Sequence, residues 1–354
     1  MKVSVILPVY NVAAYICGCI DSLCAQTLGE AVEFLFVDDH GTDGSIARAY
    51  IYIKEKTGAV EADDVEETDD ARPPLVAGNR TFRFLRTASN SGPGVAHNVG
   101  IAAARGEYVA MVDSDDTVEP TMLAELTAAA DRAGADIAYC RLRYRGGRSD
   151  GRENGNPAFA DGEVTDAVRR RFLVGMRTFC PTFLYRRSFL LANRLTFPAN
   201  RSSEDSNFLI KVLLCARRMA CVGRALYVYH VRPSSLTTAR NPQRVWDKLA
   251  AFGALMREAA DRGWLAAYGD ELGFIYAKKA FAVGMLNYLV NAGRVEADAL
   301  TRIRRALDDA VPAWRTNACL RRRTALRLFV RFLYAAPLWT MRLARRFIPR
   351  RLAL

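Results

Sequence analysis

The first half of the chain alternates between segments typical of buried strands and segments typical of helices. Predicted strands lie at VSVILPVY (3–10), EFLFVDD (33–39), FRFLRT (82–87) and YVAMVD (108–113). Predicted helices lie at residues 12–27, 43–56 and 93–105. Strands separated by helices are typical of a mostly parallel sheet, because each parallel crossover needs a helix to return the chain. The order predicts an α/β fold of the nucleotide-binding type.

Two polar stretches interrupt this pattern before the chain becomes helical. EADDVEETDDARPP (61–74) is acidic, ends in prolines and has no apolar period, so it predicts a solvated loop insertion near 58–79. RGGRSDGRENGNP (145–157) is rich in glycine and precedes a predicted helix near 165–174. From about Pro242 onward, apolar residues recur at spacings of three and four, which predicts a helical region.

The composition is that of a folded protein with an uneven charge distribution. The 354 residues are 51% hydrophobic and 25% charged, which argues against global disorder and allows two domains, or one domain with an appendage. Of the net charge of +12, the stretch from Arg315 to the end contributes eleven arginines and no acidic residue. The basicity is therefore a property of the C-terminal tail.

The cysteines and the N-terminus indicate a reducing location. The eight cysteines form no CxxC pair and have no histidine partners at zinc spacing, which argues against a zinc site. We expect reduced, mostly buried thiols. The chain enters the strand-like KVSVILPVY without the pattern of a signal peptide. We therefore expect a cytosolic protein.

Three of the predicted strands end in acidic or polar clusters, namely PVYN (8–11), VDDHGTDGS (37–45) and VDSDD (112–116). In open α/β sheets, ligands bind outside the carboxyl ends of the strands. One aspartate at a strand end is usually a cap or a turn former, but three clusters together favour a binding site. Carboxylates as close as those of VDSDD repel one another and keep raised pKa values unless a cation offsets their charge. The last cluster therefore predicts a cation.

These clusters belong to an ordered set of motifs that resembles family 2 glycosyltransferases of the GT-A fold, the type that makes bacterial polysaccharides or cell-surface glycans. In chain order the motifs are VSVILPVYNVAAYICGCIDSLCAQTL, FLFVDDHGTDGS, NSGPGVAHNVGI, GEYVAMVDSDD, FLYRRSFL and SSEDSNFLIKVLL. The resemblance implies a Rossmann-like mixed sheet with a helical C-terminal extension. It implies a catalytic domain over 1–236, while the apolar spacing and the charge of the remaining chain predict a helical region over 237–314 and a basic amphipathic tail over 315–354.

The resemblance also implies a nucleotide pocket. Asp39 would accept hydrogen bonds from the nucleobase, and the backbone around Pro8 and Tyr10 would line the same pocket. A carboxylate is a suitable acceptor for a uracil or guanine N–H group. For Asp38 we prefer a cap or a structural hydrogen bond.

DSDD matches the DxD motif of the family. Asp113 would face the ribose or the metal, and Asp115 would be the direct ligand of Mg²⁺ or Mn²⁺, which prefer oxygen ligands and bridge to substrate phosphates. Asp116 either joins this site or caps a helix starting at TVEP.

SSEDSNF (202–208) matches the acidic motif that carries the catalytic base of the family, which corresponds to Asp205. A base is needed because a free hydroxyl group is a weak nucleophile. On the residues alone, an acid pair before a helical run is also a common helix-start signal, so this alternative stays open.

Histidines mark two departures from the family pattern. His97 stands where the family usually has arginine, and His40 follows Asp39 where glycine is common. Histidine binds phosphate more weakly than arginine, because it lacks the permanent charge and the paired N–H donors of a guanidinium group. His97 is therefore a weaker candidate for a contact to the diphosphate or the metal. His230, in YVYHVRPSSLT, is a second candidate, because related enzymes carry basic residues near the diphosphate there, and a buried histidine satisfied by the backbone is an equal alternative for it.

The C-terminal tail interleaves arginines with leucines and aromatic residues, and its longest uncharged run, FLYAAPLWTM (332–341), is too short to span a bilayer. We expect an interfacial segment on an anionic membrane. A helix packed on the protein is the second alternative, and a nucleic-acid patch is the third.

Taken together, the motifs predict a metal-dependent inverting glycosyltransferase at the cytoplasmic face of the cell membrane. Its donor would be a nucleotide sugar, with a UDP-sugar favoured, and its acceptor a glycan or a lipid-linked glycan, with no nucleic-acid partner. A nucleotidyltransferase is disfavoured, because PVYNVAAY stands where a glycine-rich phosphate loop would follow the first strand. A non-catalytic nucleotide-sugar-binding membrane adaptor is the other alternative, and the retained acidic motifs count against it.

Overall fold

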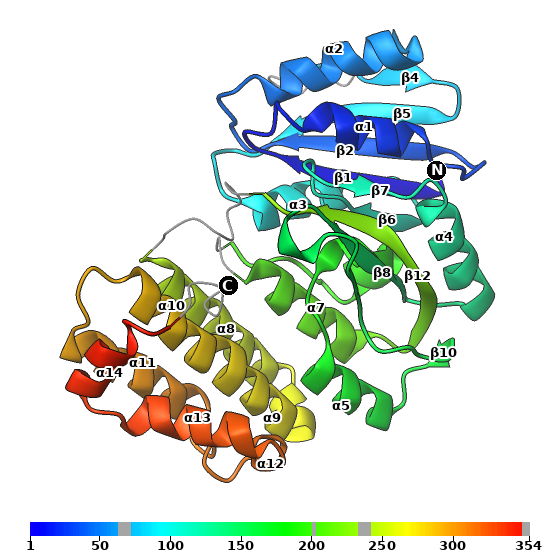
Figure 1. The fold of residues 1–354 in the computed structure, drawn as a ribbon. Coiled ribbons are helices and arrows are strands. Elements are labelled where there is room, and N and C mark those ends of the chain that lie inside the picture. Colours follow the sequence, from blue (N-terminus) through cyan, green and yellow to red (C-terminus); the bar gives the residue numbers. More distant parts are fainter. Residues whose placement is uncertain (63–71, 200–202, 233–241, 349–354) are drawn as a thin grey trace. The chain divides into compact units, whose positions relative to one another are not determined.

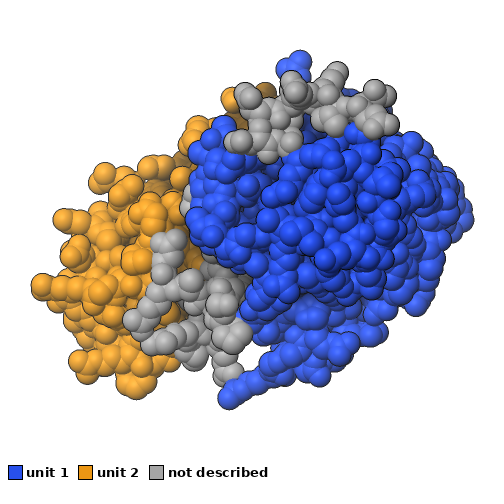
Figure 2. All heavy atoms as spheres, turned by 90° about the horizontal axis from the view of Figure 1, so that it is seen from above, with its two compact units in different colours: residues 1–165, 177–232 blue, residues 166–176, 233–354 orange. Residues whose placement is uncertain are grey.

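The protein folds into two compact units, shown as a ribbon in Figure 1 and as spheres in Figure 2. The structure is a computed structural model that describes residues 1–62, 72–199, 203–232 and 242–348. Unit 1 comprises Met1–Thr165 and Arg177–Arg232, and unit 2 comprises Asp166–Met176 and Pro233–Leu354. All motifs of the predicted site belong to unit 1.

Unit 1 is built around one mixed β-sheet. Its main strands are β1 (Val3–Val9), β2 (Val32–Asp38), β5 (Arg80–Arg86), β6 (Tyr108–Met111), β8 (Ile137–Arg145), β11 (Phe183–Arg186) and β12 (Arg218–His230). The short strands are β3 (Val60–Glu61), β4 (Leu75–Ala77), β7 (Thr117–Val118), β9 (Glu153–Asn154) and β10 (Gly162–Glu163). The order across the sheet is β10-β12-β8-β11-β6-β1-β2-β5-β4-β3, with β7 paired to β12 and β9 to β8. Because β1 is parallel to both β2 and β6, the carboxyl ends of these three strands lie at one edge.

Helices cover both faces of this sheet. They are α1 (Ile16–Cys24), α2 (Ser45–Thr57), α3 (Pro93–Ala103), α4 (Met122–Ala133), α6 (Arg187–Ala192) and α7 (Glu204–Cys215), with short 3-10 helices at Gly147–Ser149 and Cys180–Thr182. The helices α1, α2 and α4 share one core with Val5 and Leu7 of β1. On the opposite face, α3 approaches β1 so closely that a β-carbon at Gly100 would lie 2.3 Å from Ile6 Cγ2. Only glycine allows this contact without a shift of the helix.

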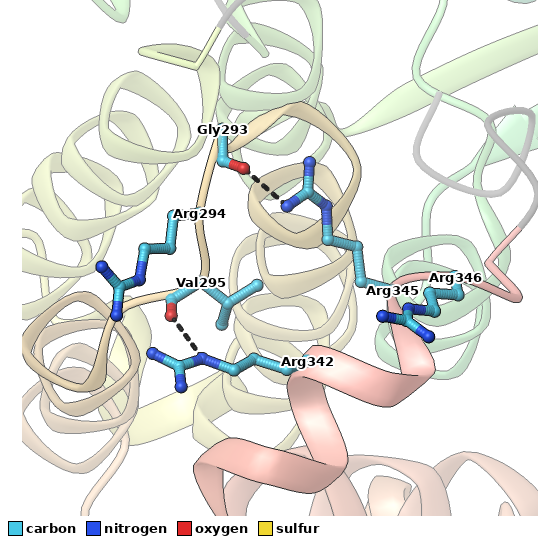
Figure 3. A pocket seen from close by; sticks show the side chains of 6 residues that line it. All are labelled: Gly293, Arg294, Val295, Arg342, Arg345 and Arg346. Carbon is cyan, nitrogen blue, oxygen red and sulfur yellow. Dashed lines mark hydrogen bonds between the residues drawn. The ribbon is translucent and has the colours of Figure 1, made fainter.

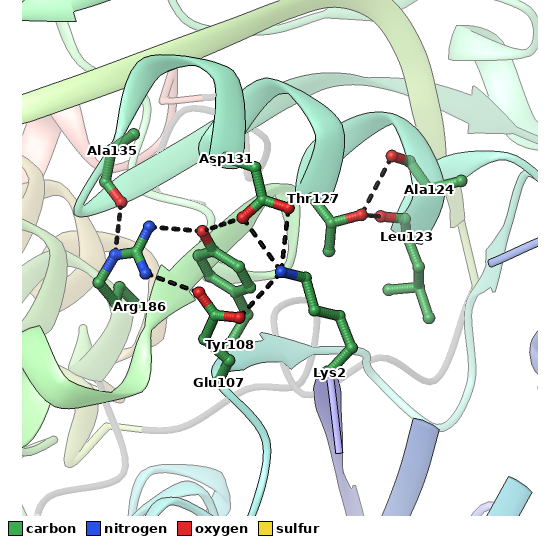
Figure 4. A network of polar contacts seen from close by, with 9 residues as sticks. All are labelled: Lys2, Glu107, Tyr108, Leu123, Ala124, Thr127, Asp131, Ala135 and Arg186. Carbon is green, nitrogen blue, oxygen red and sulfur yellow. Dashed lines mark hydrogen bonds and ion pairs between the residues drawn. The ribbon is translucent and has the colours of Figure 1, made fainter. Parts of the chain in front are cut away.

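A polar network joins the amino ends of β1 and β6 to α4 and β11 (Figure 4). The ammonium group of Lys2 pairs with Glu107 at 2.8 Å and with Asp131 at 2.9 Å. Tyr108 donates its hydroxyl proton to Asp131 at 2.8 Å, and Arg186 pairs with Glu107 at 2.7 Å. Because the network lies at the amino ends of β1 and β6, opposite the carboxyl ends where ligands bind in such sheets, we assign it to the stability of the sheet and not to ligand binding.

Unit 2 is helical. Its elements are α5 (Asp166–Gly175), α8 (Arg244–Asp261), α9 (Trp264–Ile275), the π-helix η3 (Tyr276–Ala282), α10 (Val283–Asn291), α11 (Ala297–Ala310), α12 (Ala318–Arg321), α13 (Thr324–Ala335) and α14 (Leu338–Ala344). The helix α5 belongs to this unit although sheet residues flank it in the sequence. Arg170 Nη1 of α5 donates to both carboxylate oxygens of Glu271 in α9, at 3.0 and 2.9 Å. The helix predicted near 165–174 and the helical region from Pro242 are confirmed.

The basic tail packs on unit 2 with part of its apolar surface and exposes the rest. Val330, Leu333 and Met341 are buried, whereas Leu328, Phe332, Trp339, Leu343 and Phe347 are exposed. In the described part of the chain, no helix combines the length and the apolar character that a bilayer crossing requires. Arg350 and Arg351 of the predicted tail lie outside the described residues.

The structure corrects three details of the predicted organisation. The stretch at 58–79, expected to be a solvated loop, contributes β3 and β4, which pair at the sheet edge and bury Leu75; residues 63–71 of that stretch lie outside the description. The first helix begins at Ile16 and not at residue 12. The third correction concerns the cysteines, of which only Cys19, Cys140 and Cys180 are buried.

Candidate active site

The loops that follow β1, β2 and β6 are tied together at one edge of the sheet. The side-chain oxygen of Asn11, a residue with a positive φ of 52°, accepts a hydrogen bond from the Thr42 N–H group at 2.8 Å. Ser114 donates to the carbonyl oxygen of Pro8 at 2.6 Å. Pro8 is half-buried and Tyr10 is exposed. The strand-end clusters of the sequence are therefore neighbours in space.

The same ties explain why the first helix starts late. The N–H group of Val12 donates to Ser45 Oγ at 2.9 Å, and that of Ala13 donates to the Asp43 carboxylate at 2.8 Å. These donors therefore hold the loop after β1 against the start of α2, and the helix forms only beyond them.

Asp39 is buried and holds the segment that leads into α3. Its carboxylate accepts hydrogen bonds from Thr87 Oγ1 at 2.9 Å, from the Ser91 N–H group at 2.9 Å and from the Gly92 N–H group at 2.8 Å. A carboxylate offers about four acceptor positions, so capacity for one more donor remains. Contact with a nucleobase stays a prediction for Asp39. Asp38 makes the local hydrogen bond expected of it, accepting from the Gly41 N–H group at 3.2 Å.

Three carboxylates form an acid cluster after β6, which consists of Asp113, Asp115 and Asp116. Their ligand oxygens all lie within 4.8 Å of one another. Burial raises the pKa of Asp113 well above its usual range, and the neighbouring charges of Asp116 and Asp115 raise it further. The three carboxylates thus repel one another, as the sequence pattern predicted.

Asp116 does not cap a helix, so that alternative was wrong. The residues after it form β7, and its carboxylate accepts a hydrogen bond from the Tyr227 hydroxyl at 2.8 Å and another from the His230 N–H group at 2.8 Å. Burial and the charge of Asp115 raise the pKa of Asp116 to about 7. Asp116 therefore anchors the cluster to β12, while Asp113 and Asp115 are less buried and more available to a ligand.

Arg232 is a site residue that the sequence reasoning missed. Its guanidinium pairs with the Asp115 carboxylate at 2.7 Å and lies 3.6 Å from the centre of the Tyr15 ring. The Arg232 side chain is only 10% exposed. The available signal was its place two residues after His230, which the sequence already made a candidate contact to the diphosphate or the metal.

The acid pair, Glu204 and Asp205, lies near the acid cluster. The charges of both residues contribute to the raised pKa of Asp113. The pair begins α7, and Asp205 Oδ2 accepts a hydrogen bond from the Cys180 N–H group at 3.2 Å. At the start of α3, a β-carbon on Gly94 would lie 3.3 Å from Glu204 Cβ. The close packing of α3 thus brings the acid pair toward the strand ends.

The histidines differ in their surroundings. His97 is buried and stacks on Phe197 with ring centroids 4.8 Å apart, and neither ring nitrogen has a hydrogen-bond partner within the described part of the chain. Burial lowers the pKa of His97 to about 3, so the ring is neutral and poorly suited to hold a diphosphate in this conformation. His230 Nε2 lies 3.0 Å from Thr117 Oγ1. His40 has a positive φ of 62°, a conformation that glycine adopts more easily.

The acid cluster fits a divalent cation. Oxygen ligands from two half-buried carboxylates suit Mg²⁺ or Mn²⁺, and a divalent ion would offset the repulsion between the carboxylates, which adds to burial in raising the pKa values of Asp113 and Asp116. Arg232 offsets part of the negative charge, because its guanidinium pairs with Asp115 and its charge lowers the pKa of Asp116. Asp113 and Asp115 are therefore the residues that would hold the ion.

The sheet, its covering helices and the acidic strand ends define the GT-A class of nucleotide-sugar-dependent proteins. Residues 4–192 match the family described as Glycosyl transferase family 2. The chain belongs to this family.

Two curated relatives and one solved structure illustrate the match. The chain is 32% identical over 242 residues to the uncharacterized glycosyltransferase EpsJ of Bacillus subtilis, covering 66% of this chain and 62% of the relative. It is 32% identical over 273 residues to the succinoglycan biosynthesis protein ExoO of Rhizobium meliloti, covering 73% and 69%. The fold is similar to that of S. aureus TarS residues 1–349 in complex with UDP-GlcNAc, with a TM-score of 0.67, 22% identity and coverage of 98% of this chain and 92% of that 1–349 chain.

Proposed function

We propose that the protein is a metal-dependent inverting glycosyltransferase of cell-surface polysaccharide synthesis. It moves a sugar from a nucleoside-diphosphate donor to a hydroxyl group of a glycan or lipid-linked acceptor. The observation that carries the proposal is the acid cluster after β6, with the acid pair at the start of α7 near enough for its charges to raise the pKa of Asp113. Family membership and the UDP-GlcNAc complex of TarS support it, and the latter favours a UDP-sugar donor.

The donor would bind at the carboxyl ends of β1, β2 and β6. Asp39, with the backbone around Pro8 and Tyr10, would contact the nucleobase, and Asp113 and Asp115 would hold Mg²⁺ or Mn²⁺. A bound divalent ion neutralises negative charge that grows on the leaving nucleoside diphosphate. Arg232 adds a permanently charged, planar donor group suited to phosphate oxygens.

Asp205 would act as the general base. Its carboxylate takes the proton from the acceptor hydroxyl group while that oxygen forms a bond to the anomeric carbon. The bond between the anomeric carbon and the diphosphate oxygen breaks, and the electron pair leaves with the nucleoside diphosphate. One displacement of this kind inverts the configuration at the anomeric carbon. The Cys180 N–H group bonds one oxygen of Asp205 and so helps to orient the carboxylate.

The reaction is tested by incubating the protein with a panel of nucleotide sugars, Mn²⁺ and oligosaccharide acceptors. We expect release of nucleoside diphosphate that requires the metal, and a product whose anomeric configuration, read by NMR, is opposite to that of the donor. A product with retained configuration would contradict the role of Asp205. Donor binding without turnover on any acceptor would favour a non-catalytic nucleotide-sugar binder.

We also propose that unit 2 holds the protein on the inner face of the cell membrane. The tail has eleven arginines and no acidic residue, and each basic residue near an anionic surface contributes about 1 kcal/mol. Trp339 and Phe347 are 69% and 74% exposed, so they are available to enter the boundary between headgroups and acyl chains.

Replacing both Trp339 and Phe347 by serine is expected to lower affinity for anionic vesicles by at least roughly tenfold, because burial of each large apolar side chain contributes about 1.5–3 kcal/mol. Co-sedimentation at high salt isolates this apolar part. The matched control replaces Ile51 and Val60 by serine. These two apolar residues of unit 1 are also exposed. Equal loss of binding in both variants would contradict the assignment to the tail.

A further inference from the structure

Unit 2 has a pocket of about 520 Å³ whose lining contains four arginines. The lining residues are Gly293, Arg294, Val295, Arg342, Arg345 and Arg346. The first three belong to the connection between α10 and α11, and the arginines at 342–346 belong to α14 and the turn that follows it (Figure 3). None of these residues has a role in the sugar transfer proposed above.

The four guanidinium groups have no acidic partner among the described residues. Arg342 Nε donates to the Val295 carbonyl oxygen at 3.2 Å, and Arg345 Nη1 donates to the Gly293 carbonyl oxygen at 2.7 Å. These two bonds, drawn in Figure 3, join the two segments that line the pocket but do not neutralise its charge. Like charges gathered around one space repel one another unless an anion offsets them. The pocket is therefore suited to an anion.

The arginine geometry and the neighbouring side chains narrow the choice of anion. A guanidinium group presents planar pairs of N–H donors that match phosphate oxygens, and several arginines share one phosphate because it offers several acceptor oxygens. On α14 and just beyond it, Trp339, Leu343 and Phe347 are exposed within a few residues of the pocket arginines. Exposed apolar groups beside a phosphate site are what a ligand with acyl chains requires, whereas a free phosphate would gain nothing from them.

We propose that this pocket binds the phosphate group of an anionic phospholipid headgroup. The proposal rests on the membrane association of unit 2 and deepens it, because it replaces a diffuse attraction of the tail by one defined site. Arg342 and Arg345 fix the pocket wall through their carbonyl contacts. The guanidinium groups of Arg294 and Arg346 donate no hydrogen bond within the described chain, so these donors remain for the headgroup.

The test compares two variants that each lose two positive charges. The pocket variant is Arg294→Gln with Arg346→Gln. The control is Arg321→Gln with Arg322→Gln, two exposed arginines of the same tail that do not line the pocket. Neither pair of side chains supports the fold by a hydrogen bond among the described residues, so both variants should keep the thermal stability of the wild type. If the glutamine variant does not fold, the lysine pair Arg294→Lys with Arg346→Lys takes its place, because it keeps the charge but loses the planar donor pairs.

Two measurements on the full chain decide the outcome. In co-sedimentation with phosphatidylcholine vesicles containing phosphatidic acid, the pocket variant should lose at least about tenfold more affinity than the control, since only it loses charge-assisted bonds to the headgroup. In calorimetry, monomeric short-chain phosphatidic acid should bind the wild type and the control with one site, and the pocket variant much more weakly. Equal losses of vesicle binding in the two variants would overturn the pocket and leave a diffuse attraction.

Inorganic phosphate is the third probe. We expect it to bind far more weakly than short-chain phosphatidic acid, and equal affinity would overturn the headgroup in favour of a site for soluble phosphate. If the wild type binds the short-chain lipid but does not bind vesicles, the membrane association is refuted, while the assignment of the pocket to a lipid phosphate is supported. Binding of nucleoside diphosphate with metal, measured on the same variants, should be unchanged, which separates this proposal from that of sugar transfer.

Discussion

Replacing Asp205 by asparagine is expected to lower turnover by about 10²-fold or more while donor binding is retained, as the loss of a positioned general base should. The amide keeps the size of the side chain and can still accept the hydrogen bond from the Cys180 N–H group, so the fold of this region should persist. Turnover is measured with saturating acceptor, and donor affinity is measured by calorimetry on the same preparation.

The matched control for this change is Glu204→Gln. Both acids contribute negative charge near Asp113, so both substitutions alter the electrostatic field of the site, but only Asp205 is assigned to proton transfer. We expect the glutamine variant to keep turnover much closer to that of the wild type. Similar, modest losses of turnover in the two variants would contradict the role of Asp205 as the base and leave it as a residue that starts a helix.

Replacing Asp115 by alanine is expected to remove most of the gain in nucleotide affinity that a divalent ion provides. The ratio of the nucleoside-diphosphate Kd without metal to that with Mn²⁺ should fall by at least about tenfold, which is equivalent to about 1.4 kcal/mol. The reason is that the ion would lose a direct oxygen ligand. Paired calorimetric titrations with and without Mn²⁺ measure this ratio.

Arg232→Gln serves as the control, because Asp115 also anchors Arg232 through their ion pair. If Asp115 acts through the metal, the glutamine variant binds nucleotide more weakly overall but keeps the ratio. A folded Asp115→Ala protein with the wild-type ratio would refute the assignment of the metal site.

The sequence predicted the architecture of the site because its signals are local. Strand patterns that end in acidic or polar residues, in the order β1, β2 and β6, suffice to place Asp39 and Asp113 at one edge of a parallel sheet. The same reasoning predicted helix α5 but not that α5 belongs to unit 2. That assignment depends on contacts between segments far apart in the chain, such as the ion pair of Arg170 with Glu271.

The partners of the acid cluster could not be predicted, because they depend on how distant strands pair. Tyr227 reaches Asp116 only because β12 pairs antiparallel with β7, which itself replaced an expected helix start. The same strand carries the chain to Arg232 beside Asp115. A histidine at position 97 suggested a phosphate contact, whereas burial against Phe197 leaves it neutral. Burial and side-chain partners of this kind depend on tertiary packing, which a local sequence pattern does not predict.

The central claim is that the carboxyl ends of β1, β2 and β6 hold a nucleotide sugar together with a divalent ion. It is tested most directly by thermal unfolding of the wild-type protein with a panel of nucleoside-diphosphate sugars, each with Mn²⁺, with Mg²⁺ and with a chelator. A ligand that binds only the folded state raises its stability, by about 2.7 kcal/mol at a concentration of one hundred times its Kd. We predict that at least one donor, with a UDP-sugar the first candidate, raises the Tm, and that the chelator removes most of this increase. A Tm that no nucleotide sugar changes, with or without metal, would contradict the claim.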